Sequence, residues 1–87
     1  MNRALEFYID KVDRYGMDIP EGTFIYDAVD TGRGIVLTGR GDVGNAPVRR
    51  HYGVFLTGAD IPENAEPVRA VATMASGTVW HVFELLD

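Results

Sequence analysis

The stretch that decides the predicted fold class is Arg3-Ala-Leu-Glu-Phe-Tyr-Ile-Asp-Lys-Val-Asp-Arg-Tyr15. Its main apolar residues follow the i, i+3, i+4, i+7 spacing of one helix face, and they are Leu5, Tyr8, Ile9, Val12 and Tyr15. Asn2 is a suitable N-cap, and Gly16 is a suitable left-handed stop. We therefore predict an amphipathic helix over residues 3–15.

Phe7 is the apolar residue that does not fit this helical spacing. At about 100° per residue, its side chain points roughly 160° away from that of Leu5. We interpret Phe7 either as a half-covered flank residue or as an anchor for a partner. The acids of the polar helix face are further candidate contact residues, namely Glu6, Asp10 and Asp13.

The rest of the chain changes from the helical period towards the period of two that is typical of strands. Four segments are rich in β-branched and aromatic residues and are bounded by Gly, Pro or Asp, namely 23–30, 34–38, 51–57 and 78–86. A fifth segment, 67–75, fits a helix and a strand equally well.

A weak internal repeat bears on this fifth segment. Residues 18–31 align without gaps on residues 60–73, with seven identities that include Asp-Ile-Pro-Glu at the start of both copies. Asp and Pro in this pattern favour a turn. Because the first copy leads into the strand predicted at 23–30, we favour a strand for 67–75.

The expected architecture is a single α+β domain over residues 1–87. The N-terminal helix would pack on an antiparallel sheet of about five strands, made of two hairpins and the single strand 51–57. The last strand, 78–86, is apolar on both faces, and one helix covers only one of them. We expect the second face to meet a curled sheet, a second copy in a homodimer, or another partner.

Composition excludes several classes of function. The absence of cysteine rules out disulfides, thiolate metal sites and cysteine nucleophiles. The net charge of −5 is unlike that of a dedicated nucleic-acid binder. His51 and His81 lack the spacing of a metal site, so we expect no metal and no cofactor, and a half-buried, hydrogen-bonded role for His81.

The sequence also gives an expectation for localisation. The longest uncharged stretch, residues 70–83, is shorter than the ~18 apolar residues of a membrane span. Glu6 and Asp10 interrupt the apolar run that a signal peptide needs. We therefore expect a cytoplasmic protein that is not in the membrane.

Two motifs could indicate an enzyme. Asp30-Thr-Gly32 resembles the active-site turn of aspartic proteases, but Arg33 stands where that family has Ser or Ala. Gly39-Arg-Gly-Asp-Val-Gly44 has the spacing of a dinucleotide-binding loop, but too few residues follow it for a crossover helix. We interpret the first as a hairpin turn and expect no enzymatic activity.

The arginine-rich segment 39–52 is the remaining candidate for binding chemistry. We predict a long loop in which Arg40, Arg49, Arg50 and His51 converge on a phosphate, RNA or a partner's carboxylates. The alternative is that these arginines pair with the protein's own acids.

By elimination, the sequence predicts a small non-enzymatic protein–protein interaction domain. In size and charge it resembles inhibitors and immunity-type proteins, including those that phages and mobile elements make against nucleic-acid-handling complexes. The predicted partner-binding residues are Phe7, Glu6, Asp10, Asp13, Arg40, Arg49 and Arg50. The alternative is an anion- or nucleic-acid-binding domain that uses loop 39–52.

Overall fold

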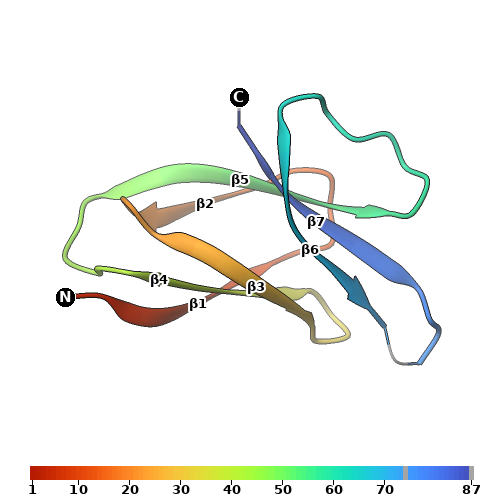
Figure 1. Cartoon of the computed structure of the whole chain (residues 1–87), viewed down its shortest axis with the longest axis horizontal. Helices are drawn as coiled ribbons and strands as arrows, with labels where there is room; N and C mark the ends of the chain where they lie inside the picture. The colour runs from red at the N-terminus through yellow and green to blue at the C-terminus, as the bar shows by residue number, and fades with distance from the viewer. Residues whose placement is uncertain (74, 87) are drawn as a thin grey trace.

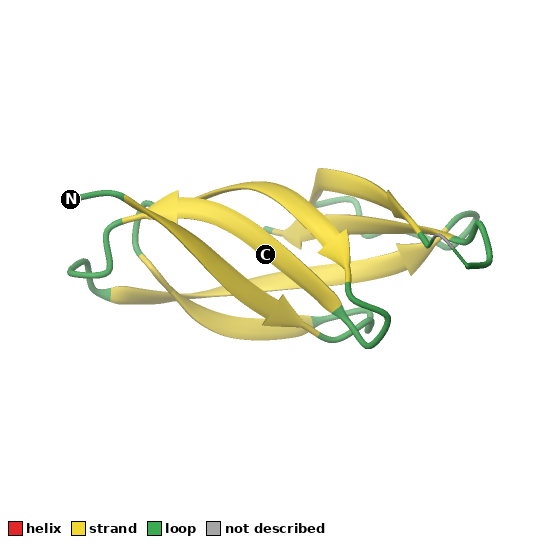
Figure 2. Cartoon of the chain, turned by 90° about the horizontal axis from the view of Figure 1, so that it is seen from below, coloured by secondary structure: helices red, strands yellow, loops and turns green. Residues whose placement is uncertain are grey.

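The computed structural model describes residues 1–73 and 75–86, and within them the chain is all-β (Figure 1). The strands are β1 (Arg3–Ile9), β2 (Tyr15–Pro20), β3 (Phe24–Asp30), β4 (Ile35–Gly41), β5 (Pro47–Leu56), β6 (Ala65–Ala72) and β7 (Val79–Leu85). They form two antiparallel sheets, with the orders β1-β4-β3 and β2-β5-β7-β6. In the side view of Figure 2 the strands form two layers.

The predicted N-terminal helix is wrong, and with it the α+β fold class. Residues 3–15 form β1, a connection and the first residue of β2. Along β1, Leu5, Phe7 and Ile9 are partly or fully buried while the residues between them are exposed. Phe7 therefore fits the period of two, although it does not fit the helical spacing. All seven residues of β1 pair with β4, and this long-range pairing overrides the local helical pattern.

The predicted strands outside that segment are confirmed, but their arrangement in one sheet is wrong. The segments 23–30 and 34–38 pair as the hairpin of β3 with β4, and β6 pairs with β7 as the second hairpin. The ambiguous segment 67–75 is a strand as far as Ala72, as the repeat indicated, and its Met74 lies outside the described residues. A second sheet, rather than a helix, covers the inner face of the first.

The two copies of the internal repeat share one structural feature. A register shift interrupts β3 between Ile25 and Asp27, and another interrupts β6 between Pro67 and Arg69. The bulge residues, Tyr26 and Val68, have the same spacing as the two Asp-Ile-Pro-Glu segments. Each bulge lies in a strand at the free edge of its sheet, β3 in one sheet and β6 in the other.

The core lies between the two sheets. Its largest fully buried side chains are Tyr52, Ile9, Ile19, Ile35, Leu37 and Val82. Each buried aliphatic side chain stabilises the fold by about 1.5–3 kcal/mol relative to an exposed position. One end of the core holds a buried ion pair, in which Lys11 Nζ lies 3.0 Å from the Asp30 carboxylate and 4.9 Å from the centre of the Trp80 ring. This ion pair joins the β1–β2 connection to β3.

Candidate interaction surface

The outer face of the β1-β4-β3 sheet carries a group of exposed apolar side chains. Phe24 is 58% exposed, Tyr26 and Val29 are each 49% exposed, and Tyr8 is 47% exposed. The pairing register places Tyr8, Val36 and Val29 in one row across the three strands. We call this surface the outer aromatic face and define it as Glu6, Tyr8, Phe24, Tyr26, Val29, Val36, Thr38 and Arg40.

Contacts within the outer aromatic face hold its rings in place. The Phe24 and Tyr26 rings stack with their centres 6.3 Å apart and their planes 25° from parallel. The Arg40 guanidinium lies 5.9 Å from the centre of the Phe24 ring. The Tyr8 ring lies over Gly34, where an added Cβ would come within 2.6 Å of it. The face therefore presents pre-ordered aromatic and arginine side chains, which are the residue types that dominate protein interfaces.

Asp10 lies at one edge of this face, next to Tyr8. The Asp10 carboxylate raises the pKa of the Tyr8 hydroxyl, through a hydrogen bond that loss of the proton would remove. Asp10 and Asp13 are both exposed in the connection between β1 and β2. Both predicted contact residues are therefore available at the surface, and Asp10 adjoins the outer aromatic face.

The other predicted contact residues do not form one group. Glu6 and Arg40 lie on the outer aromatic face, whereas Phe7 packs against the core from the inner side of β1. The aromatic residues of β3 were missed, although the i, i+2 spacing of Phe24 and Tyr26 was a signal for a common face. Sequence alone did not show which face of β3 meets the core.

The segment 39–52 is not a long loop, so the predicted convergence of its arginines does not occur. β4 continues to Gly41 and β5 begins at Pro47. Arg49 and Arg50 are neighbours on a strand and therefore point to opposite faces. Arg49 is exposed and lies 3.6 Å from the Asp18 carboxylate, whereas the Arg50 side chain is only 19% exposed.

Arg50 forms a compact network below the free edges of β3 and β6. Its Nε and Nη2 donate to the Glu84 carboxylate at 2.8 Å each, and its Nη1 donates to the Thr23 carbonyl at 2.6 Å. Hydrogen bonding to Glu84 raises the pKa of Arg50 further above its usual range. The charge of Arg50 is therefore balanced by an acid of the same protein.

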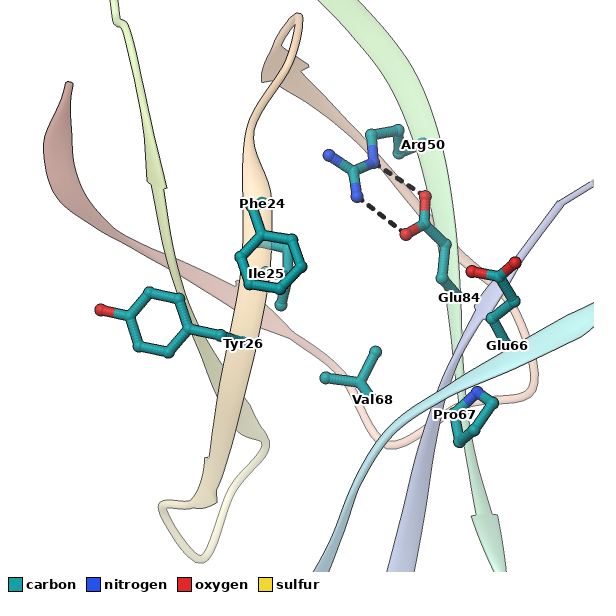
Figure 3. Close-up of a pocket in the computed structure, with 8 residues that line it drawn as sticks. All are labelled: Phe24, Ile25, Tyr26, Arg50, Glu66, Pro67, Val68 and Glu84. Carbon is teal, nitrogen blue, oxygen red and sulfur yellow. Dashed lines mark hydrogen bonds and ion pairs between the residues drawn. The ribbon is translucent and has the colours of Figure 1, made fainter. Parts of the chain in front are cut away.

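A pocket of about 340 Å³ opens between the free edges of β3 and β6, and we call it the inter-edge pocket (Figure 3). It is lined by Phe24, Ile25, Tyr26, Arg50, Glu66, Pro67, Val68 and Glu84. In Figure 3 the β3 residues lie on one side, and the two glutamates lie together on the other side, next to Arg50. The pocket thus combines aromatic and aliphatic groups with two carboxylates and one guanidinium.

One pair of side chains has the composition of a catalytic dyad. Thr57 Oγ1 lies 2.8 Å from His81 Nε2, beside a smaller apolar pocket of about 180 Å³. Within residues 1–73 and 75–86, no carboxylate is hydrogen-bonded to the His81 ring to orient it as a base. The half-buried, hydrogen-bonded role that we predicted for His81 is confirmed.

No cluster of three or more His, Cys, Asp or Glu side chains suited to a metal ion occurs among the residues that the structure describes. The same part of the chain contains no helix that could cross a membrane. Comparisons with protein-family models, curated proteins and solved structures find no match for this chain.

Proposed function

We propose that this protein is a small non-enzymatic interaction domain that binds another protein through its outer aromatic face. The observation that carries this proposal is a group of four large apolar side chains on one sheet face, each about half exposed. They are Tyr8 from β1 and Phe24, Tyr26 and Val29 from β3. Singly exposed apolar residues are common in soluble proteins, but a contiguous group of aromatic residues is typical of an interaction site.

The dimensions of the molecule are compatible with such a role. Its two longer dimensions are 39 and 27 Å, so one whole side of the molecule is similar in size to the ~800 Å² that each partner contributes to a standard interface. The mixture of rings with Arg40, Thr38 and Glu6 gives that face hydrogen-bonding groups as well as apolar area. This combination is typical of interfaces between proteins that also exist separately.

We further propose that the domain acts by occupying a surface of its partner, as inhibitors and immunity-type proteins do. Its small size and net charge of −5 suit a partner with a basic surface, such as a component of a nucleic-acid-handling complex. We do not propose direct nucleic-acid binding, because Arg49 and Arg50 lie on opposite faces and Arg50 is paired with Glu84.

The test is affinity capture from an extract of the source organism with the wild-type protein and two variants. The face variant combines Tyr8→Ala with Val29→Ala, which lie in one row of the outer aromatic face and do not line the inter-edge pocket. The matched control is Val43→Ala, because Val43 is 61% exposed in the β4–β5 turn. We expect the wild-type protein and the control to capture the same protein, and the face variant to lose it.

Two results would contradict the proposal. Capture of the same proteins by all three forms would show that the outer aromatic face is not the binding surface. A concentration-dependent dimer that sedimentation analysis detects, and that the face variant abolishes, would show that a second copy occupies the face instead of another protein.

A further inference from the structure

We propose that the inter-edge pocket binds the side chain of a lysine or arginine residue that the partner protein presents. The proposal rests on the proposed function for the identity of the partner, but the chemistry of the pocket can be tested without that partner. Its volume of about 340 Å³ lies at the lower end of the ~300–1,000 Å³ range of small-ligand pockets. A single long side chain is an occupant of suitable size.

The pocket contains an unbalanced carboxylate, which favours a cation as its occupant. Glu66 of β6 lies directly opposite Glu84 of β7, and like charges in this position destabilise a sheet. Arg50 neutralises Glu84 through two hydrogen bonds. Within the described residues the carboxylate of Glu66 has neither an ion pair nor a hydrogen bond, and this residue is exposed. A cation from a partner would balance this charge, whereas an anion would be repelled.

The walls of the pocket also suit a lysine or arginine side chain. Ile25, Pro67 and Val68 offer apolar surface on which the methylene groups of a lysine or arginine side chain can pack. The Phe24 ring stands at the same pocket, whereas the Tyr26 ring points away from the two glutamates (Figure 3). A cation in the pocket can therefore lie against the Phe24 ring. The site therefore provides apolar contacts for the stem of the side chain and an unpaired carboxylate for its charged end.

The edges of the pocket are poorly suited to pairing with an added strand. Pro67 has no backbone N–H to donate, and the bulges at Tyr26 and Val68 interrupt the regular edges of both β3 and β6. Recognition between these edges must therefore rely on a side chain rather than on a continuous backbone ladder. Because Phe24 and Tyr26 also belong to the outer aromatic face, a partner on that face can reach the pocket.

The proposal can be tested by NMR titration of the wild-type protein with three small amides. The cationic probes are the N-acetyl methylamides of lysine and arginine, and the neutral probe is the N-acetyl methylamide of norleucine, which keeps the stem of lysine. We expect both cationic probes to shift the backbone signals of Tyr26 and Val68 in a saturable way, and the neutral probe to shift them much less.

Two variants make the test specific. Glu66→Gln removes the charge and keeps the shape, and we expect it to weaken binding of the cationic probes about fivefold. Glu63→Gln is the matched control, because Glu63 is exposed in the connection before β6 and does not line the pocket. Equal binding of the neutral probe, shifts at other sites only, or undiminished binding by Glu66→Gln would each overturn the proposal.

The two proposals can fail separately. If the cationic probes bind in the pocket but the face variant captures the same proteins as the wild type, the pocket stands and the proposed function fails. If the face variant loses its partner but no cationic probe binds, the proposed function stands and the pocket proposal fails.

Discussion

Arg50 of β5 and Glu84 of β7 form a two-point ion pair across neighbouring strands, with both N–O distances 2.8 Å. Each side chain is only 19% exposed, so water screens the pair weakly. Arg50 also neutralises the charge of Glu84, which would otherwise face the like charge of Glu66 directly opposite it on β6. The ion pair therefore contributes to the stability of the fold and fixes the charge of the inter-edge pocket.

The first prediction concerns this pair. We expect Arg50→Met to lower the free energy of unfolding by about 3 kcal/mol, because Glu84 then remains half-buried and unpaired opposite Glu66. The double variant Arg50→Met/Glu84→Met should recover most of the loss, since it removes both charges. Urea unfolding measures both values. A loss below about 1 kcal/mol for the single variant would show that the pair behaves as a surface ion pair.

The second prediction concerns acid stability. Backbone hydrogen bonding from Gly32, together with Thr73 and Lys11, lowers the pKa of Asp30 below its ordinary value of 3.8. The pKa of Asp30 is lower in the folded protein than in the unfolded chain. The ionised Asp30 carboxylate therefore stabilises the fold fully well above pH 3.8, and this stabilisation is lost as the pH falls through the folded pKa. Asp30→Asn should therefore reduce stability at pH 7 and flatten its dependence on pH in the acid range.

The control for Asp30 is Asp60→Asn, since Asp60 is exposed in the connection between β5 and β6. Denaturant unfolding at several pH values between neutrality and acid gives the comparison. An identical pH profile for wild type and Asp30→Asn would contradict the assigned role of Asp30.

The third prediction concerns Tyr52, which is fully buried in the core. Its hydroxyl oxygen has no hydrogen-bond partner within the described residues, and burial raises the pKa of Tyr52 well above its usual range. An unsatisfied buried polar group costs about 1–3 kcal/mol, so we expect Tyr52→Phe to increase the free energy of unfolding by about 1 kcal/mol. Thermal or urea unfolding tests this, and a clear loss of stability would show that the hydroxyl forms a hydrogen bond with a neighbour such as Glu84.

The fourth prediction tests the path of residues 10–14 over β5. Val54 donates its backbone N–H to the Val12 carbonyl at 2.9 Å, and a Cβ at Gly53 would lie 2.5 Å from the Asp13 carbonyl oxygen. Gly53→Ala should therefore destabilise the protein by about 1–3 kcal/mol. Gly44→Ala, in the exposed β4–β5 turn, is the control and should change stability by less. Equal effects of the two substitutions would contradict this path.

Hairpins and turns were the part of the fold that the sequence could predict. The strand segments of both hairpins have a local period of two, and each hairpin turn contains a glycine with a positive φ, 88° at Gly32 and 71° at Gly77. These signals lie within a few residues of one another. These signals can therefore be recognised without knowing how the rest of the chain folds.

The N-terminal segment could not be assigned in this way, because its residues satisfy two patterns at once. Leu5 and Ile9 fit both the helical spacing and the strand period, and Phe7 fits only the strand period. The choice is made by pairing with β4, about thirty residues further along the chain. The error at residues 3–15 carried over to the candidate site, because a helix would have placed Phe7 towards solvent.

The candidate site was only partly predictable for a related reason. Glu6 and Arg40 were identified as surface residues, and both lie on the outer aromatic face. Arg49 and Arg50 point to opposite faces because they lie in strand β5, where we predict a loop from the sequence. Phe24 and Tyr26 can be identified as contact residues only when it is known which face of β3 packs against the core. If β3 were buried on both faces, both aromatic side chains would be expected in the core.

Photocrosslinking from the outer aromatic face tests the binding proposal most directly. A benzophenone amino acid placed at position 8, at position 29 or, as the control, at position 43 is irradiated in cells of the source organism. We predict that positions 8 and 29 crosslink to the same protein and that position 43, 61% exposed on a turn, does not. The absence of an adduct at positions 8 and 29, or the same adducts at all three positions, would contradict binding through this face.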